Sequence, residues 1–391
     1  MNHDTPSRQP DPITIAAHFA AADDILSLNP HGRGLINDSY LVRCRTGGAF
    51  LLQRLNPDVF SQPELLLHNL RLVGDHLRRK DDQARIAMRR QAIKLLPTRQ
   101  QHDCHYDPQG VCWRALEFIE NGRTLTGITH PNQAFEAGGV LGRFHRLLYD
   151  LPPARLHDPL PTLHVLPRVL ARYHELLNGY SPLNQQVSAP GERLHELAAG
   201  PGPGNDQAEQ QFCRAFITRR QGEAAGLEQA RARGILVERV IHGDPKLDNI
   251  LFDRESDRAL ALVDLDTVKP GLIHYDIGDC LRSCCNRAGE ESSSPEEVLF
   301  DLELARALLA GYLEEMRPLL TADDLACFYQ AVHLIAFELG LRFFSDYLAG
   351  NRYFKVEDPR HNLRRALNQF RLVESIERQK PGLQAIIAEL T

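Results

Sequence analysis

The sequence lacks several features that would place it in a class at once. It has no apolar run long enough to cross a bilayer, so we expect neither an integral membrane protein nor a membrane partner. It has no excess of basic residues: 45 Lys and Arg face 51 Asp and Glu, a formal charge of −6, which argues against a nucleic-acid partner. Residues 1–12 lack the apolar core of a signal peptide and are expected to form a disordered leader.

Cysteine is also scarce. The 391 residues hold eight cysteines and no CxxC pair, too few for a disulfide scaffold, so we expect reduced thiols and a cytoplasmic protein. Cys280 and Cys284 lie one helical turn apart, and buried thiols on a helix face are favoured there over a metal site.

Two common phosphate-binding motifs are missing. There is no GxxxxGK[ST], so a P-loop kinase is unsupported, and no GxGxxG opens a helix after a strand. Gly32 and Gly34 are the nearest substitute: they precede the first expected strand and would let the backbone approach the phosphates of a nucleotide. A plain turn accounts for the two glycines equally well.

The N-terminal part of the chain reads as β-rich. Residues 35–45 alternate between polar and apolar side chains, residues 46–48 supply a turn, and residues 49–55 continue as a second strand, so a hairpin is expected. Residues 111–119 read as a further strand, followed by a break at Asn121-Gly122.

A helix is expected between these strands. Ser61 and Glu64 have the spacing of a capping box. The core-facing stripe that follows consists of Leu66, Leu70, Val73 and Leu77.

Helical patterns dominate from Pro131 onward. The Gly- and Pro-rich stretch at 188–206 is expected to be an exposed loop, either a lid or a spacer. The fold class expected is therefore α+β, with a small β-rich N-terminal lobe over 13–120 and a larger, mainly helical C-terminal lobe over 121–391.

A dense set of polar residues brackets two short strands of the C-terminal part. Its members are His242, Asp244, Lys246, Asp248, Asn249, Asp264 and Asp266. Such a cluster of carboxylates is costly unless a cation neutralises it. The oxygens of Asn and Asp are hard ligands that suit Mg²⁺ rather than zinc.

This set matches the needs of phosphoryl transfer to a hydroxyl. Asp244 is expected to orient the attacking hydroxyl, and Asn249 with Asp264 to bind Mg²⁺. Asp266 is expected to contact a second metal ion or its water shell, and Lys246 to offset charge on the transferred phosphate. Each residue alone fits an ordinary polar hairpin whose acids cap turns, but the ordered set favours function.

The segment His242–Asn249 reads HGDPKLDN, and this HGDxxxxN pattern followed by a strand ending in Asp resembles the aminoglycoside phosphotransferase and choline kinase superfamily. The chain is more closely similar to N-acetylhexosamine 1-kinases over most of its length, apart from the leader and the 188–206 stretch. The similar segments are residues 34–42, 50–60, 263–271, 275–282, 340–354 and 361–373.

The resemblance implies a bilobal, protein-kinase-like fold that uses ATP and Mg²⁺, with a catalytic loop inside residues 240–282. It places adenine against the backbone near Glu117 and Ile119. It also implies that His242 braces the catalytic loop and that Asp276 holds its backbone. Most members carry Lys or Arg where this chain has Gln53, and a neutral amide cannot supply that positive charge.

The acceptor is expected to bind in the helical lobe. Arg342 and Asp346 stand one helical turn apart and can project together toward a sugar, although an ion pair between them carries equal weight. Tyr347 and Tyr353 can stack on a sugar face or simply pack.

The resemblance thus implies transfer of the ATP γ-phosphate to the anomeric hydroxyl of an N-acetylhexosamine, by a monomer or homodimer. Another small hydroxyl acceptor (a different hexose, an aminoglycoside or an amino alcohol) is the alternative. A non-catalytic pseudokinase is supported only by Gln53.

Overall fold

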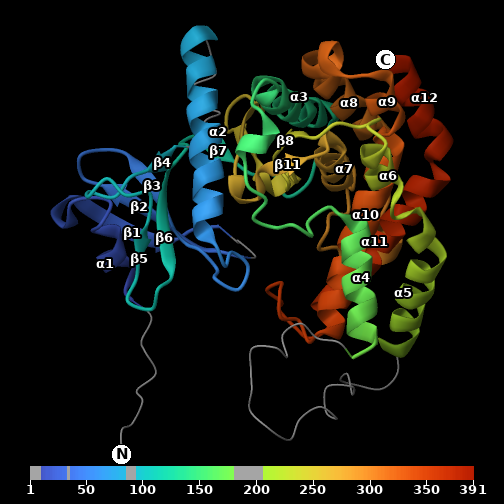
Figure 1. Ribbon diagram of the computed structural model, residues 1–391, viewed down its shortest axis with the longest axis horizontal. Coiled ribbons are helices and arrows are strands. Elements are labelled where there is room, and N and C mark those ends of the chain that lie inside the picture. The colour runs from blue at the N-terminus through green and yellow to red at the C-terminus, as the bar shows by residue number, and fades with distance from the viewer. Residues whose placement is uncertain (1–9, 33–35, 85–93, 180–205) are drawn as a thin grey trace, which may run out of the picture. The chain divides into compact units, whose positions relative to one another are not determined.

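The computed structural model describes residues 10–32, 36–84, 94–179 and 206–391 (Figure 1). The chain forms two compact units, Met1–Asn121 and Gly122–Thr391. The first is built around a β-sheet and the second is mainly helical, so the expected α+β fold class is confirmed. The stretch expected to form an exposed loop lies outside the described residues except for Asp206, which begins a helix.

The first unit contains a six-stranded antiparallel sheet of order β1-β2-β3-β6-β4, with β5 also paired to β6. The strands are β1 (Ile25–Pro30), β2 (Asp38–Cys44), β3 (Ala49–Arg54), β4 (Leu95–Leu96), β5 (His105–Tyr106) and β6 (Cys112–Glu117). The expected hairpin is present as β2 and β3. Strand β1 was not anticipated, so Gly32 lies in the connection between β1 and β2 rather than before the first strand.

One face of this sheet forms the core of the first unit. Val42, Leu52 and Ala115 are fully buried there against Ile15 and Ala16 of the short helix α1 (Pro12–Ala16). Asp11 caps α1 by accepting a hydrogen bond from the backbone of Ile13, so the end of the expected leader belongs to the fold.

Helix α2 (Pro63–Ala84) carries the expected stripe, and all four of its apolar side chains are buried. The expected capping box is wrong. The helix begins at Pro63, which puts Gln62 at the N-cap position in place of Ser61. The Glu64 carboxylate instead accepts a hydrogen bond of 2.6 Å from the Tyr106 hydroxyl.

The second unit holds two small antiparallel sheets that frame the polar cluster. One has the order β10-β9-β7 and the other pairs β11 with β8. These strands are β7 (Gly122–Arg123), β8 (Arg239–Ile241), β9 (Ile250–Asp253), β10 (Ala259–Leu262) and β11 (Lys269–Gly271).

Helices make up the rest of the second unit. They are α3 (Pro131–Leu148), α4 (Leu166–Leu177), α5 (Asp206–Arg220), α6 (Gly226–Ala232), α7 (Ile273–Cys284), α8 (Leu302–Met316), α9 (Ala322–Ala326), α10 (Phe328–Leu348), α11 (His361–Arg378) and α12 (Lys380–Leu390). The apolar helix α10 packs against α4, α7 and α11, and α3 packs along α8. No helix within the described ranges is long and apolar enough to cross a membrane.

Candidate active site

The loop that joins β8 to β9 carries the HGD segment and turns sharply at Gly243. This residue has φ +85°, and a Cβ added to it would lie 2.5 Å from the carbonyl oxygen of Thr267. Only glycine fits such a backbone beside such a neighbour. The turn therefore fixes the direction in which the next residue, Asp244, leaves the chain.

The backbone of this loop is held by Asp276 of α7. Its Oδ2 accepts the N–H of His242 at 2.7 Å, and its Oδ1 accepts the N–H of Gly243 at 2.8 Å. His145 of α3 contacts Oδ2 through Nε2 at 2.8 Å. Burial alone would raise the pKa of Asp276, but the hydrogen bond and charge of His145 outweigh it and lower the pKa. Asp276 is thus an ionised, buried anchor for the loop.

His242 links the loop to the end of β10. Its Nδ1 accepts the N–H of Asp244 at 3.3 Å, so the ring proton is on Nε2, which donates to the carbonyl of Val263 at 3.0 Å. The side chain is fully buried, and burial lowers the pKa of His242. These contacts give His242 a bracing position as a neutral imidazole.

Asp244 and Asn249 face each other across the loop. Asn249 Nδ2 donates to Asp244 Oδ2 at 2.9 Å and to the Asp244 backbone carbonyl at 2.8 Å. Lys246 Nζ also donates to Oδ2, at 2.8 Å. Both side-chain bonds use the same carboxylate oxygen, and the Asp244 side chain is 30% exposed. Oδ1 of Asp244 is therefore the oxygen that can accept a hydrogen bond from a bound hydroxyl.

Asp244 and Lys246 each favour the charged form of the other. Burial would raise the pKa of Asp244, but the Lys246 ammonium outweighs it and lowers that pKa. Burial would likewise lower the pKa of Lys246, but Asp244 and Glu290 raise it above its ordinary value. Both groups are thus charged at neutral pH.

The end of β10 brings Asp264 beside the loop. The N–H of Val263 donates to the Asn249 carbonyl at 2.9 Å, and Asp264 follows directly. Asp264 has φ +64°, a left-handed conformation that is uncommon outside glycine and is concentrated at functional sites. Its side chain is exposed, whereas Asp266 is buried.

The donor set decides which metal would fit. Within the described residues no three His, Cys, Asp or Glu side chains form a metal cluster. The oxygens expected from the sequence to bind a metal are those of the Asn249 amide and of the Asp264 and Asp266 carboxylates; of these, Asn249 and Asp266 are buried and Asp264 is exposed. Mg²⁺ in enzymes is usually held by one or two carboxylates and completed by phosphate oxygens and water. The set fits a magnesium ion brought in with a nucleotide, not a cage made by protein alone.

A charged cluster beside Asp244 was missed from the sequence. Arg282 Nε donates to Asp279 Oδ1 and its Nη1 donates to Glu290 Oε2, both at 2.8 Å. The Arg282 charge contributes to the lowered pKa of Asp244. Asp279 and Arg282 occur three residues apart on α7, within a segment that the resemblance singled out, and that spacing was the available signal.

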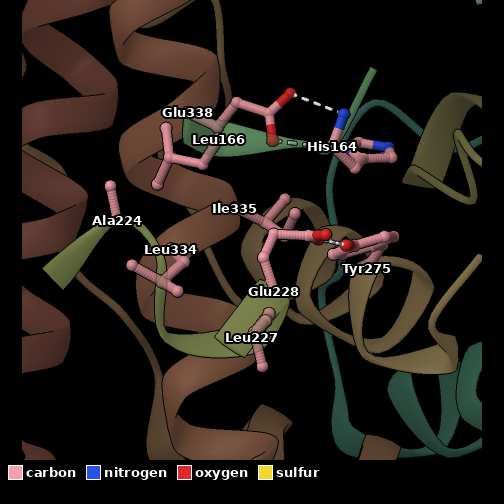
Figure 2. A pocket seen from close by; sticks show the side chains of 9 residues that line it. All are labelled: His164, Leu166, Ala224, Leu227, Glu228, Tyr275, Leu334, Ile335 and Glu338. Carbon is pink, nitrogen blue, oxygen red and sulfur yellow. Dashed lines mark hydrogen bonds and ion pairs between the residues drawn. The ribbon is translucent and has the colours of Figure 1, made fainter. Parts of the chain in front are cut away.

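A second contact that the sequence did not predict holds the loop. His164 Nε2 donates to the Gly243 carbonyl at 2.7 Å. The backbone N–H of His164 donates to Glu338 Oε1 at 2.9 Å, and Figure 2 shows these two residues side by side. The Nδ1 atom of His164 lies 3.5 Å from Glu338 Oε2. The adjoining cavity is about 10 Å³, at the lower limit for one water molecule, so it is no substrate site.

The expected acceptor residues do not act as a group. Asp346 Oδ1 accepts the N–H groups of Arg352 and Tyr353, and its Oδ2 accepts the N–H of Phe354 and the amide of Asn362. These four bonds occupy the acceptor positions of the carboxylate. In this structure Asp346 holds the loop after α10, and no ion pair joins it to Arg342, although both residues are described.

The other three acceptor candidates differ in exposure. The Arg342 guanidinium lies 5.8 Å from the ring centroid of Tyr353, whose side chain is 36% exposed. Tyr347 is buried, and its hydroxyl accepts a hydrogen bond from Gln210 at 3.1 Å. Tyr353 is therefore partly open to solvent beside Arg342, while Tyr347 packs inside.

The nucleotide candidates lie in the first unit. Gln53 on β3 is buried and accepts hydrogen bonds from Arg114 of β6. Gly32 has φ +78° in the β1–β2 connection, and Gly34 lies outside the described residues. Glu117 is the exposed last residue of β6, and Ile119 follows it, half-buried, two residues later.

Solved structures with the same fold are kinases and phosphotransferases. A microcompartment-associated aminopropanol kinase matches with a TM-score of 0.58 at 16% identity, over 95% of this chain and 98% of that one. An aminoglycoside phosphotransferase from Alicyclobacillus acidocaldarius matches with a TM-score of 0.55 at 15% identity, over 100% and 98%. An amicoumacin kinase in complex with AMP-PNP and Ca²⁺ matches with a TM-score of 0.53 at 16% identity, over 97% and 96%.

These identities establish the fold, and the sequence itself establishes the family. The family model described as "Phosphotransferase enzyme family" (APH) matches residues 27–319, which include most of the first sheet, the HGD loop, α7 and Asp264. The chain therefore belongs to the APH phosphotransferase enzyme family.

Proposed function

We propose that this phosphotransferase is an ATP- and Mg²⁺-dependent kinase that phosphorylates the anomeric hydroxyl of an N-acetylhexosamine. The observation that carries the proposal is the polarised carboxylate of Asp244, whose Oδ2 is held by Lys246 and Asn249. Its Oδ1 is left to receive an acceptor hydroxyl. Family membership and the similarity of several segments to hexosamine 1-kinases support the choice of reaction.

Asp244 would act by orientation. Its lowered pKa keeps it ionised, so Oδ1 accepts a hydrogen bond from the hydroxyl and aims the hydroxyl oxygen at the γ-phosphorus. The new bond joins that oxygen to phosphorus as the bond to the β–γ bridging oxygen breaks, ADP leaves, and the hydroxyl proton passes to Asp244 and then to water. The anomeric hydroxyl is the most acidic on the ring, so a strong base is unnecessary.

Asn249 and Asp264, with Asp266 as a contact to a second metal ion or its water shell, would hold magnesium, which would neutralise phosphate charge when bound. Lys246 would offset charge on the transferred phosphate. In the first unit, the backbone near Glu117 and Ile119 is proposed to contact adenine.

We propose Arg342 and Tyr353 as the acceptor contacts, and Asp346 as the residue that holds the loop carrying Tyr353.

The fold supports one alternative. The aminopropanol kinase and the aminoglycoside phosphotransferase share it, so an amino alcohol or aminoglycoside acceptor is the second candidate.

An acceptor panel separates these functions. ADP release would be measured with ATP, Mg²⁺ and, in turn, N-acetylglucosamine, N-acetylgalactosamine, the methyl glycoside of each, 1-amino-2-propanol, ethanolamine and kanamycin. The proposal predicts turnover only with the two free sugars, because the methyl glycosides lack the anomeric hydroxyl. Equal turnover of the methyl glycosides, or turnover only with the amines, would contradict it.

A further inference from the structure

The peptide group that joins Gly243 to Asp244 has both of its polar atoms bound to histidine rings. The Gly243 carbonyl accepts from His164 Nε2 at 2.7 Å. The Asp244 N–H donates to His242 Nδ1 at 3.3 Å. Because a peptide group is planar, the two bonds together fix its orientation. That orientation sets the direction in which the Asp244 side chain leaves the backbone.

The ring of His164 lies between two oxygens that accept hydrogen bonds. Its Nε2 faces the Gly243 carbonyl, and its Nδ1 lies 3.5 Å from Glu338 Oε2. Neither Nδ1 nor Oε2 has a hydrogen-bond partner elsewhere among the described residues. A neutral imidazole has only one N–H, so one of its nitrogens would turn a lone pair toward an oxygen. The surroundings therefore favour an imidazolium, whose charge is balanced by Glu338, a residue that is 1% exposed.

The backbone of His164 is held in a conformation that few residues adopt. Its φ is +65°, in the left-handed region, and its N–H donates to Glu338 Oε1 at 2.9 Å. The carbonyl of the preceding residue, Leu163, accepts from Lys269 Nζ at 2.9 Å, and this lysine is 2% exposed. A left-handed residue other than glycine persists only where its surroundings hold it, and such residues cluster at functional sites.

The side-chain bonds of Asp244 do not by themselves place it in the second unit. Lys246 and Asn249 both hold its Oδ2, but both belong to the same loop and would move with it. His164 comes from the segment before α4, and Glu338 comes from α10, so this pair ties the loop to the helices. Phosphoryl transfer depends on this placement, because a shift of about 1 Å can cost about a hundredfold in rate.

We propose that His164 is a positioning residue for the transfer: as an imidazolium paired with Glu338, it fixes the Gly243–Asp244 peptide so that Oδ1 of Asp244 meets the acceptor hydroxyl. His164 acts through Asp244 and touches no reacting atom. The inference rests on the proposed function, because it assumes that Asp244 orients an acceptor hydroxyl.

Two substitutions at position 164 separate the hydrogen bond from the backbone conformation. Asparagine adopts a left-handed backbone readily, but its amide is too short to reach the Gly243 carbonyl. Glutamine is long enough to bring an amide N–H to the place of Nε2. We expect His164→Asn to lower kcat by about ten- to hundredfold and His164→Gln to stay within about fivefold of wild type. KM for ATP should change by less than about twofold in both, because no nucleotide contact is altered.

Arg168→Met is the matched control. Arg168 is exposed, and its Nη1 donates to the Pro161 carbonyl at 2.7 Å, in the same segment as His164. Its loss loosens the segment without removing the bond to the HGD loop, so kcat should stay within about twofold of wild type.

Steady-state kinetics would use ATP, Mg²⁺ and whichever of N-acetylglucosamine and N-acetylgalactosamine the wild type turns over faster. Unchanged kcat in His164→Asn, or the same loss in Arg168→Met as in His164→Asn, would overturn the inference alone. Turnover of neither sugar by the wild type would contradict the proposed function, and the variants would then be compared with the amine that the wild type phosphorylates.

The protonation of the ring can be measured without any acceptor. Long-range ¹H–¹⁵N correlation spectra of protein labelled with ¹⁵N-histidine show how many protons each ring carries, and the His164 signal is the one absent from His164→Gln. At neutral pH this ring should carry two protons in the wild type and one in Glu338→Gln, whose amide N–H can donate to Nδ1. A single ring proton on His164 in the wild type would overturn the inference, even if His164→Asn does not fold.

Discussion

The two oxygens of the Asp244 carboxylate have different surroundings, and this asymmetry is the residue-scale basis of the account. Oδ2 receives Lys246 and Asn249, while Oδ1 faces away from both bonds. The backbone N–H of the same residue is tied to His242. Asp244 therefore has little rotational freedom before any substrate arrives, which lowers the entropy cost of aligning an acceptor.

Asp244→Asn should lower kcat by about 10²- to 10⁴-fold with little change in nucleotide affinity, because the amide can offer the hydroxyl a donor in place of an acceptor. Steady-state kinetics with the best acceptor, and calorimetry with AMP-PNP, would measure the two effects. Asp248→Asn is the control: this exposed neighbour makes no hydrogen bond to the acceptor-facing oxygen, and its kcat should stay within a few-fold of wild type. Near-normal kcat in Asp244→Asn would remove the assigned role.

The pair His164–Glu338 gives the protein a defined pH dependence. Burial would lower the pKa of His164, but the charge of Glu338 raises it above its ordinary 6.5. Burial would raise the pKa of Glu338, but the charge of His164 lowers it below its ordinary 4.5. The pair's stabilisation is therefore complete between pH 4.5 and 6.5. It is lost as pH rises through the raised His164 pKa or falls through the lowered Glu338 pKa.

Glu338→Gln keeps the acceptor for the His164 N–H but removes the charge. It should cost about 3 kcal/mol of unfolding free energy near pH 6, because an uncompensated charge is left buried. The cost should shrink as pH rises above the raised His164 pKa. Urea unfolding at a series of pH values would measure it, with the exposed Glu175→Gln as control. A cost independent of pH would show that His164 is not charged in the folded protein.

At this scale the sequence could predict residues that share a short motif. Asp244, Asn249 and Asp264 are close in sequence and in space, and the loop between them follows from the strands on either side. The structural role of Asp346, which is to hold the loop after α10, could not be predicted. Its four hydrogen-bond donors come from that loop and from α11. A carboxylate and an arginine one helical turn apart look alike whether or not the carboxylate is occupied elsewhere.

Among the elements, the HGD loop depends most on a single small residue. Gly243→Ala adds the strain of a left-handed backbone and a clash with the Thr267 carbonyl. We expect a loss of about 3 kcal/mol or more in unfolding free energy together with loss of phosphotransfer. Gly234→Ala is the matched control. Its φ is +72°, but a Cβ added there would have no neighbouring atom within 4 Å. It should cost only about 1–2 kcal/mol and leave kcat unchanged, and equal costs for the two variants would contradict the account.

The contact between α3 and α8 depends on glycines that let the helix backbones approach. A Cβ on Gly311 would overlap the Phe135 carbonyl oxygen, whereas one on Gly139 would lie 3.9 Å from the Gly311 carbonyl oxygen. Gly311→Ala should therefore lower the melting temperature by several degrees. Gly139→Ala should leave it unchanged or raise it, because alanine favours the helix. Thermal unfolding of both variants would measure the difference, and no loss in Gly311→Ala would refute this packing.

Sequence patterns predicted the elements with strong local signals. The β2–β3 hairpin and the stripe on α2 follow from alternation and helical spacing, and both are confirmed. Strand β1 was missed because it ends at Pro30, just before the glycine turn that was expected to precede the first strand. The capping box was misplaced because Pro63 is well suited to the first helical position, and it starts α2 one residue later than Ser61 required.

At the scale of the whole molecule, the decisive contacts join residues far apart in the chain. Asp276 reaches back to His145, and Glu338 reaches back to His164. No short sequence pattern predicts such pairs, because they depend on how α3, α7 and α10 pack together. The family and the fold class could be anticipated from motifs, whereas the support beneath the catalytic loop required the structure.

We propose that this chain transfers a phosphoryl group from ATP to the anomeric oxygen of an N-acetylhexosamine. Phosphorus NMR of the product, formed from ATP, Mg²⁺ and either N-acetylglucosamine or N-acetylgalactosamine, would identify the carbon that carries the phosphate. We expect a sugar phosphate whose phosphorus couples to the anomeric proton, formed together with ADP. Phosphorus coupled to a proton at any other carbon, or ATP left intact in the presence of both sugars, would contradict it.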